Sequence, residues 1–209
     1  MPDGQETVFV VDDDEAVRRS LARLLRSAGL TVESFASARE FLARDGDDGV
    51  GCIVLDVRMP DLDGMGLQAR LADEGDDLPI VFLTGHGDIP LSVRAMKKGA
   101  FDFLTKPVDE DVLLTTVRQA LLGHQVARVD RLKAEALRAR VDTLTPREKE
   151  VVRCVIAGAR NKQIADHLGI AEHTVKLHRG QVMKKLGVNT VTALVNACQQ
   201  AGIEQTTIS

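Results

Sequence analysis

Side chains that could bind a metal ion or a phosphoryl group stand at the ends of short apolar runs in this sequence. Five apolar runs in the first half have the length and composition of buried strands: 8–11, 31–35, 52–55, 80–83 and 101–104. Four of these runs are followed within two residues by an acidic, hydroxyl or cationic group: Asp12 and Asp13, Asp56, Thr84, and Lys106. If the strands are parallel, their carboxyl ends share one edge of a sheet, and we expect these groups to lie close together there.

These residue types predict phosphoryl transfer to a carboxylate. Three carboxylates repel one another unless a hard divalent cation holds them, and an oxygen-only set predicts Mg²⁺, or Mn²⁺ in its place. Lys106 offers a positive charge and Thr84 a hydroxyl group to the phosphoryl oxygens. We expect Asp56 to attack the phosphorus in line while the metal and Lys106 absorb charge on the equatorial oxygens. A single Asp at a strand end is usually a turn or cap residue, but that does not explain four such strand ends together.

The stretches between the apolar runs predict the elements that position these groups. Helical patterns occupy five of them: 15–28, 38–43, 65–73, 89–98 and 110–122. Strands that alternate with helices predict an α/β fold with a doubly wound, five-stranded parallel sheet over residues 1–124. The stretch 125–142 is charged, rich in Ala and Arg and free of Pro, so it predicts a helical linker. We expect a solvated helix there. The alternative is a weak coiled-coil contact between two copies of the chain through Val129, Leu132, Ala136 and Ala139.

Residues 143–209 predict an all-α unit of helix-turn-helix character. Four short helices are expected, at 146–157, 161–168, 172–186 and 190–201. Thr145, followed by Pro146 and Glu148, is a strong signal for the start of the first.

Charge and aromatic content differ between the two halves. The formal net charge of −4 combines 13 Lys and Arg against 23 Asp and Glu in residues 1–124 with 14 against 8 in residues 125–209. A basic second half favours an anionic partner such as nucleic acid. The sequence has no Trp or Tyr, and its six Phe all lie in the first half, which excludes a second half that stacks single-stranded bases on aromatic rings.

The three Cys form no CxxC pair and are expected to be buried. With no basic leader and no apolar run of spanning length, we expect a cytoplasmic protein that does not contact the membrane.

The predicted helix 172–186 has one apolar and one basic face. Val175, His178, Val182 and Leu186 share the side expected to pack on the core. The opposite side carries His173, Lys176, Leu177, Gly180 and Lys184. This face suits the major groove of double-stranded DNA, where lysines meet phosphate or guanine and Leu177 a thymine methyl group. The remaining candidate DNA contacts, expected mainly at phosphates, are Lys162, Thr174, Arg179 and Lys185. For this helix alone, a solvated basic face is the simpler interpretation.

Residues 7–122 resemble the receiver domain of two-component response regulators. The segments VFVVDDDE, VLDVRMPDLDG, FLTGHG and FLTKP carry the resemblance. It implies the strand order 2-1-3-4-5, Asp56 as the phosphoacceptor and Lys106 as the lysine that binds the phosphoryl group. The Mg²⁺ ligands that it implies are Asp12, Asp13, Asp56 and the backbone carbonyl of Arg58.

The same resemblance implies a switch pair, Thr84 and Phe103, and a cis peptide bond before Pro107. Position 103 is Phe where many receivers have Tyr, so its rotation would be sensed as packing alone. Gly85 leaves the pocket open, which predicts access for small phosphodonors and for water. The neighbouring His86 is expected to be an exposed loop residue and not a catalytic base.

Residues 143–201 resemble the LuxR-type helix-turn-helix domain through LTPREKEVV and NKQIADHLGIAEHTVKLHRGQVMKKLGV. With the receiver in front, the whole chain resembles a FixJ/NarL-type response regulator of the FixJ-like branch. The resemblance implies a recognition helix at 172–186 that binds promoter DNA, although Gly180 departs from relatives with larger residues. It also implies a sensor histidine kinase, RNA polymerase and, after phosphorylation, a second copy of the chain as partners. No catalysis is expected beyond the protein's own phosphorylation and dephosphorylation.

Other classes of protein explain these residues less well. An aspartyl-phosphate phosphatase of the haloacid dehalogenase kind needs an Asp two residues after its nucleophile, where this chain has Arg58. An interaction module that works without phosphate would bind DNA equally well with Asp56 or with Asn at that position. A purely structural assembly protein leaves the Asp and Lys residues unexplained.

Overall fold

The computed structural model describes residues 6–44, 49–85 and 89–203. The chain divides into two compact units between Arg128 and Val129. The first unit has alternating strands and helices, and the second is helical. The division falls within one helix, a few residues after the domain end expected at residue 124.

Within the described residues of the first unit, five strands form a parallel sheet in the order β2-β1-β3-β4-β5. Their bounds are β1 Thr7–Val11, β2 Thr31–Phe35, β3 Gly51–Asp56, β4 Ile80–Thr84 and β5 Asp102–Thr105. Each lies within one residue of an apolar run in the sequence. The predicted fold and strand order are therefore confirmed.

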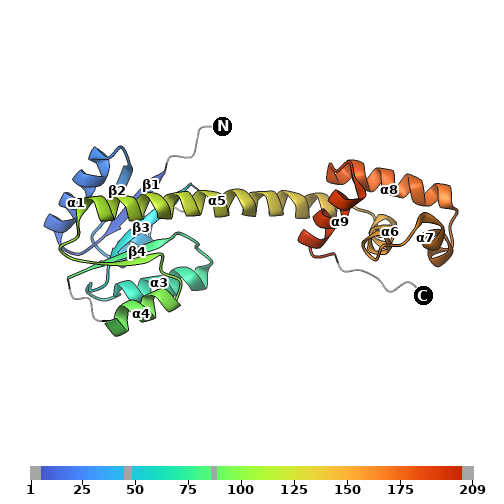
Figure 1. The fold of residues 1–209 in the computed structure, drawn as a ribbon. Helices are drawn as coiled ribbons and strands as arrows, with labels where there is room; N and C mark the ends of the chain where they lie inside the picture. Colours follow the sequence, from blue (N-terminus) through green and yellow to red (C-terminus); the bar gives the residue numbers. More distant parts are fainter. Residues whose placement is uncertain (1–5, 45–48, 86–88, 204–209) are drawn as a thin grey trace. The chain divides into compact units, whose positions relative to one another are not determined.

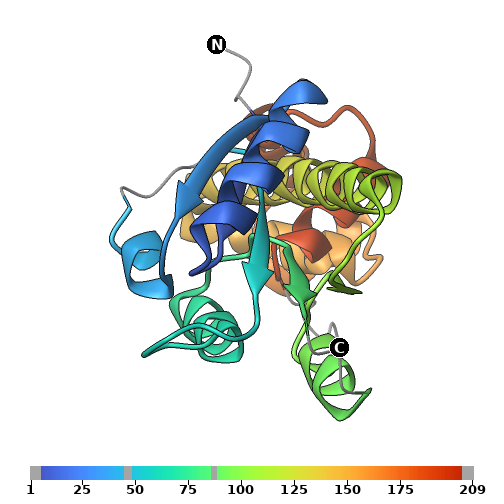
Figure 2. The same cartoon turned by 90° about the vertical axis from the view of Figure 1, so that its left-hand side faces the viewer.

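Helices cover both faces of this sheet (Figures 1 and 2). They are α1 Glu15–Ser27, α2 Ala38–Leu42, α3 Gly64–Glu74, α4 Ile89–Lys97 and the first part of α5, which spans Glu110–Asp142. Because successive strand residues point to opposite faces, Val8 and Val10 pack with α1 and α5, while Phe9 and Val11 pack with α2, α3 and α4. The inner strands β1, β3 and β4 are buried on both faces, as their continuous apolar runs predicted, whereas the edge strands β2 and β5 are partly exposed.

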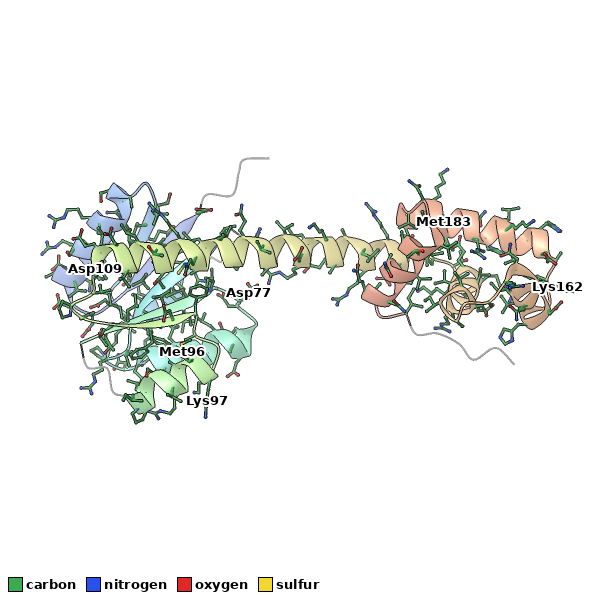
Figure 3. The ribbon with its side chains drawn as sticks, in the orientation of Figure 1. Asp77, Met96, Lys97, Asp109, Lys162 and Met183 are labelled. Atoms are coloured by element: carbon green, nitrogen blue, oxygen red, sulfur yellow. The ribbon has the colours of Figure 1, made fainter. Side chains whose placement is uncertain are left out.

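Helix α5 continues through Gly123 to Asp142, so the stretch predicted as a helical linker is helical. His124 is buried, and its Nδ1 accepts a hydrogen bond from the backbone N–H of Gly51 at 3.0 Å. Its Nε2 lies 3.3 Å from Oδ1 of Asp77, a residue labelled in Figure 3. Arg128 donates to the carbonyl of Gly49 at 3.3 Å. These contacts fix α5 beside the start of β3, at the opposite end of the strand from Asp56.

The second unit packs around an apolar core. Its helices are α6 Pro146–Ile156, α7 Asn161–Leu168, α8 Glu172–Leu186 and α9 Val191–Gln200. Thr145 and Glu148 form the predicted capping box at the start of α6. The core includes Val141 and Leu144, from the end of α5 and just beyond it, together with the inner face of α8. Cys52, Cys154 and Cys198 are free and buried, as expected.

Candidate functional site

The carboxyl ends of the strands bring together the charged residues that the sequence singled out. Asp12 follows β1, Asp56 ends β3 and Lys106 follows β5. The Lys106 Nζ lies 2.6 Å from Oδ2 of Asp12 and 2.8 Å from Oδ1 of Asp56. Both carboxylates are buried, whereas the Lys106 side chain is about one quarter exposed. One cation therefore binds two buried anions at the edge of the sheet.

Backbone groups fix the orientation of both carboxylates. The N–H of Asp14 donates to Oδ1 of Asp12 at 2.9 Å, and the N–H of Arg58 donates to Oδ2 of Asp56 at 2.6 Å. The Arg18 guanidinium on α1 donates to the backbone carbonyl of Asp12 at 2.7 Å. Sequence reasoning missed this role of Arg18, since a contact from a helix to a strand end has no local signal.

Burial and hydrogen bonding set the charges at this site. Burial raises the pKa of Asp12 above its ordinary value, although the Lys106 ammonium and the Asp14 N–H both oppose the rise. Burial alone would lower the pKa of Lys106, but its hydrogen bonds to Asp12 and Asp56 outweigh burial and raise it. Lys106 is therefore a cation at neutral pH, available to a phosphoryl group.

The carboxylates form a pair bridged by Lys106, where the sequence predicted three meeting at one point. Asp13 is exposed. Among the residues that the structure describes, no three His, Cys, Asp or Glu side chains are grouped so as to hold a metal ion. The donor set still fits Mg²⁺, since Asp12 and Asp56 offer only oxygens and Asp13 follows Asp12 directly in the chain. The ligand role predicted for the Arg58 carbonyl stays a prediction.

The proposed switch residues lie on β4 and β5. Thr84 is buried at the end of β4, and its carbonyl accepts a hydrogen bond from the N–H of Lys106 at 2.7 Å. Phe103 is partly buried, with its ring centroid 6.0 Å from that of Phe82. Gly85 is exposed, and within the described ranges a Cβ there would meet no atom within 4 Å. Its effect on access to the site stays a prediction. His86 lies outside the described residues. The peptide bond before Pro107 is cis, as predicted.

The second unit exposes the face of α8 that the sequence predicted for DNA. Val175, Val182 and Leu186 are buried in its core. The outward face is exposed, and its members are His173, Lys176, Leu177, Gly180 and Lys184. Lys162, labelled in Figure 3, is exposed on α7. The outward face of α8 thus presents Lys176 and Lys184 together with the exposed Leu177.

Three other candidate DNA contacts have partners within the protein. Arg179 is partly buried and donates to Oδ1 of Asn161 on α7 at 2.6 Å. Thr174 is partly buried, with its hydroxyl 3.4 Å from Nε2 of His173. Lys185 forms an ion pair with the buried carboxylate of Glu148 at 2.6 Å. Their contacts with DNA stay predictions, and Lys185 in addition has a role inside the unit.

Known proteins share both units of this chain. Residues 8–118 match the model of the response regulator receiver domain, and residues 142–197 match that of bacterial regulatory proteins of the luxR family. The chain is 43% identical to the response regulator protein TmoT of Ectopseudomonas mendocina over 200 residues, 96% of this chain and 91% of that protein. It is 41% identical to the transcriptional regulatory protein FixJ of Rhizobium meliloti over 196 residues, 94% of this chain and 96% of FixJ.

Solved structures give the same result. The response regulator StyR matches with a TM-score of 0.86 and 47% identity, covering 94% of this chain and 99% of StyR. The FixJ receiver domain matches with a TM-score of 0.53 and 43% identity, over 56% of this chain and 94% of that domain.

The chain therefore belongs to the response regulators and has a receiver domain followed by a LuxR-type DNA-binding domain. Within that class it is a transcription regulator similar to FixJ, which confirms the branch that its motifs predicted. None of the helices in the described part of the chain combines the length and apolar character needed to cross a bilayer.

Proposed function

We propose that Asp56 accepts a phosphoryl group from a sensor histidine kinase and that this modification controls binding of the LuxR-type domain to promoter DNA. The observation that carries the proposal is the contact of Lys106 with both Asp12 and Asp56. An ammonium group at this position can neutralise a phosphoryl group added to Asp56. A purely structural ion pair would not require two buried carboxylates beside an open strand end.

Each residue has a defined part in the transfer. A carboxylate oxygen of Asp56 attacks the phosphorus as the bond to the donor's leaving group breaks, and the leaving group departs with its electron pair. Lys106 contacts the incoming oxygens, and the N–H of Arg58 holds the second oxygen of Asp56 in place. Mg²⁺, held by Asp12, Asp13, Asp56 and the Arg58 carbonyl, would supply positive charge to the phosphoryl oxygens. Mn²⁺ could replace it.

The switch pair links this chemistry to the surface of the receiver. Thr84 would move toward the phosphoryl group, and Phe103, which packs beside Phe82, would move inward behind it. The surface formed by α4, β5 and α5 would then favour a homodimer. A change from 1% to 99% active protein needs about 5.5 kcal/mol from the phosphoryl group and the dimer contacts together. Two recognition helices would then meet half-sites roughly 34 Å apart.

The remaining partners follow from this function. The DNA-bound dimer would contact RNA polymerase, and the protein would act in the cytoplasm, where kinase and promoter are both available. We propose no further enzymatic activity, because the general acid of an aspartyl-phosphate phosphatase would stand where this chain has Arg58.

Intact mass measurement after incubation with acetyl phosphate and Mg²⁺ tests the modification. The wild type should gain one phosphoryl group of the acyl type, which hydroxylamine removes, and Asp56→Asn should gain none. Equal labelling of the two proteins would show that Asp56 is not the acceptor.

A further inference from the structure

The end of α5 and the end of α8 exchange hydrogen bonds in the second unit. Arg140, in the last turn of α5, donates through Nη1 to the backbone carbonyl of Leu186 at 3.2 Å. In the other direction, Lys185 donates through Nζ to the carbonyl of Thr143, just beyond the end of α5, at 3.1 Å. Each of the two helix ends thus provides one cation and one carbonyl.

Both carbonyls are groups that a helix end leaves without a partner inside the helix. Leu186 is the last residue of α8, and Gly187 follows it with φ of 70° as a left-handed cap. A positive charge at this end also interacts favourably with the helix dipole. A Cβ at position 187 would lie 3.0 Å from Nη1 of Arg140, so this glycine leaves room for the arginine.

A second contact of Lys185, with Glu148, fixes the orientation of its side chain. Its Nζ lies 2.6 Å from Oε2 of Glu148, the buried carboxylate of the α6 capping box. Burial by itself would raise the pKa of Glu148, but hydrogen bonds from Lys185 and Thr145 outweigh burial and lower it. Lys185 is two thirds buried as a side chain and joins three segments at one point.

We propose that Arg140 and Lys185 form a reciprocal clasp that makes the last turn of α5 part of the DNA-reading unit, with Arg140 as a positioning residue for the recognition helix α8. The proposal rests on the function proposed above, since it assumes that α8 reads DNA. The angle between the last turn of α5 and α8 is then fixed, because the two helix ends move as one body. Arg140 acts through α8 and makes no contact with DNA itself.

The fold of the second unit does not depend on Arg140. The apolar anchors Val141 and Leu144 place the end of α5 in the core, whereas Arg140 is exposed. Replacing Arg140 should therefore loosen the angle between α5 and α8 without unfolding the unit. Arg138 is the matched control, since it is exposed on the same helix about 200° around from Arg140.

The test uses the full chain with acetyl phosphate and Mg²⁺, and two measurements. The first is the ratio of affinities for a duplex selected by the wild type from a random library and for a shuffled duplex of the same composition. The second is the distribution of distances between spin labels at Glu135→Cys and Gln181→Cys, two exposed positions on α5 and α8. The affinity ratio and the distance distribution are each measured for four proteins: the wild type, Arg140→Ala, Arg140→Lys and Arg138→Ala.

Arg140→Ala should broaden the distance distribution and lower the affinity ratio about fivefold, the net effect of losing one partly buried hydrogen bond. Arg140→Lys should recover most of both, and Arg138→Ala should match the wild type. The slope of affinity against salt should stay unchanged, because no phosphate contact is lost. The proposal would be overturned if Arg140→Ala left the distance distribution unchanged or made the slope of affinity against salt shallower. It would also be overturned if the fall in the affinity ratio were explained by the fraction of the variant that is unfolded. Failure of the wild type to select any duplex would instead overturn the proposed function.

Discussion

Lys106 Nζ lies 2.8 Å from Oδ1 of Asp56, across the ends of β5 and β3. Because the same nitrogen is 2.6 Å from Asp12, a single ammonium group forms ion pairs with both carboxylates before any phosphoryl group arrives. Phosphorylation of Asp56 adds oxygens to this position and gives Lys106 a new partner. The ion pair therefore prepares the site for the negative charge that it is to receive.

Lys106→Met should lower the rate of Asp56 labelling by acetyl phosphate at least about tenfold, because a fixed cation at the developing charge is lost. The rate is measured by intact mass over time at saturating Mg²⁺. Lys97→Met, at an exposed position of α4 labelled in Figure 3, is the control and should label like the wild type. Equal rates for the two variants would remove Lys106 from the mechanism.

Asp12→Asn should stabilise the receiver at neutral pH in the absence of Mg²⁺. Burial raises the pKa of Asp12 above 3.8, so the folded state holds its proton more tightly than the unfolded state. The stability from this proton is complete below pH 3.8 and is lost as the pH rises through the folded-state pKa. The gain from Asn should therefore be largest at pH 7 and shrink toward pH 4, as measured by chemical unfolding.

Added Mg²⁺ provides the matching control for this variant. It should stabilise the wild type through binding to the folded state, and it should have little effect on Asp12→Asn, which lacks one carboxylate ligand. A variant that is less stable than the wild type at every pH would contradict the assignment of a charge penalty to Asp12.

Gly85→Ala should slow both labelling by acetyl phosphate and loss of the phosphoryl group. A Cβ at this position meets no atom of the described residues within 4 Å, so those residues accommodate alanine, while the added methyl group would narrow access to Asp56. Both rates are followed by intact mass, and the melting temperature shows whether the fold is retained. Unchanged rates would mean that Gly85 does not control access to Asp56.

The elements and the strand-end residues could be predicted because their signals are local. Apolar runs placed each strand within one residue, and the helix 172–186 was predicted with its bounds. The continuation of α5 through Gly123 had no such signal, since a glycine weakens a helix and the supporting contacts of His124 and Arg128 come from distant residues.

The charged pairs of the second unit could not be predicted for the same reason: their partners are distant in the sequence. From the sequence, Lys185 is expected to contact a phosphate, because its helix is basic. Its partner Glu148 lies 37 residues away, so the ion pair leaves no local signal in the sequence. At the strand ends, the sequence predicted that Asp12, Asp56 and Lys106 lie together, as they do, but it grouped three carboxylates where the structure places Lys106 between two. Pairing over long sequence distances depends on the packed fold.

Lys162→Ala and Lys176→Ala should weaken DNA binding in different ways. Lys162, on α7, is expected at a phosphate, so its loss should weaken selected and shuffled duplexes alike and reduce the salt slope by about 1. Lys176, on the exposed face of α8, is expected at a base edge, so its loss should cost about 1–3 kcal/mol on the selected duplex alone. Fluorescence anisotropy at several salt concentrations distinguishes the two, and identical effects would contradict the assigned face.

Phosphorylation of Asp56 should control the binding of the LuxR-type domain to DNA. The most direct measurement is the affinity of the wild type and of Asp56→Asn for the selected duplex, each before and after acetyl phosphate with Mg²⁺. The wild type should bind at least about tenfold more tightly after treatment, a shift of about 1.4 kcal/mol, and the affinity of Asp56→Asn should not change. Equal responses of the two proteins, or no response of the wild type once labelling is verified, would contradict this expectation.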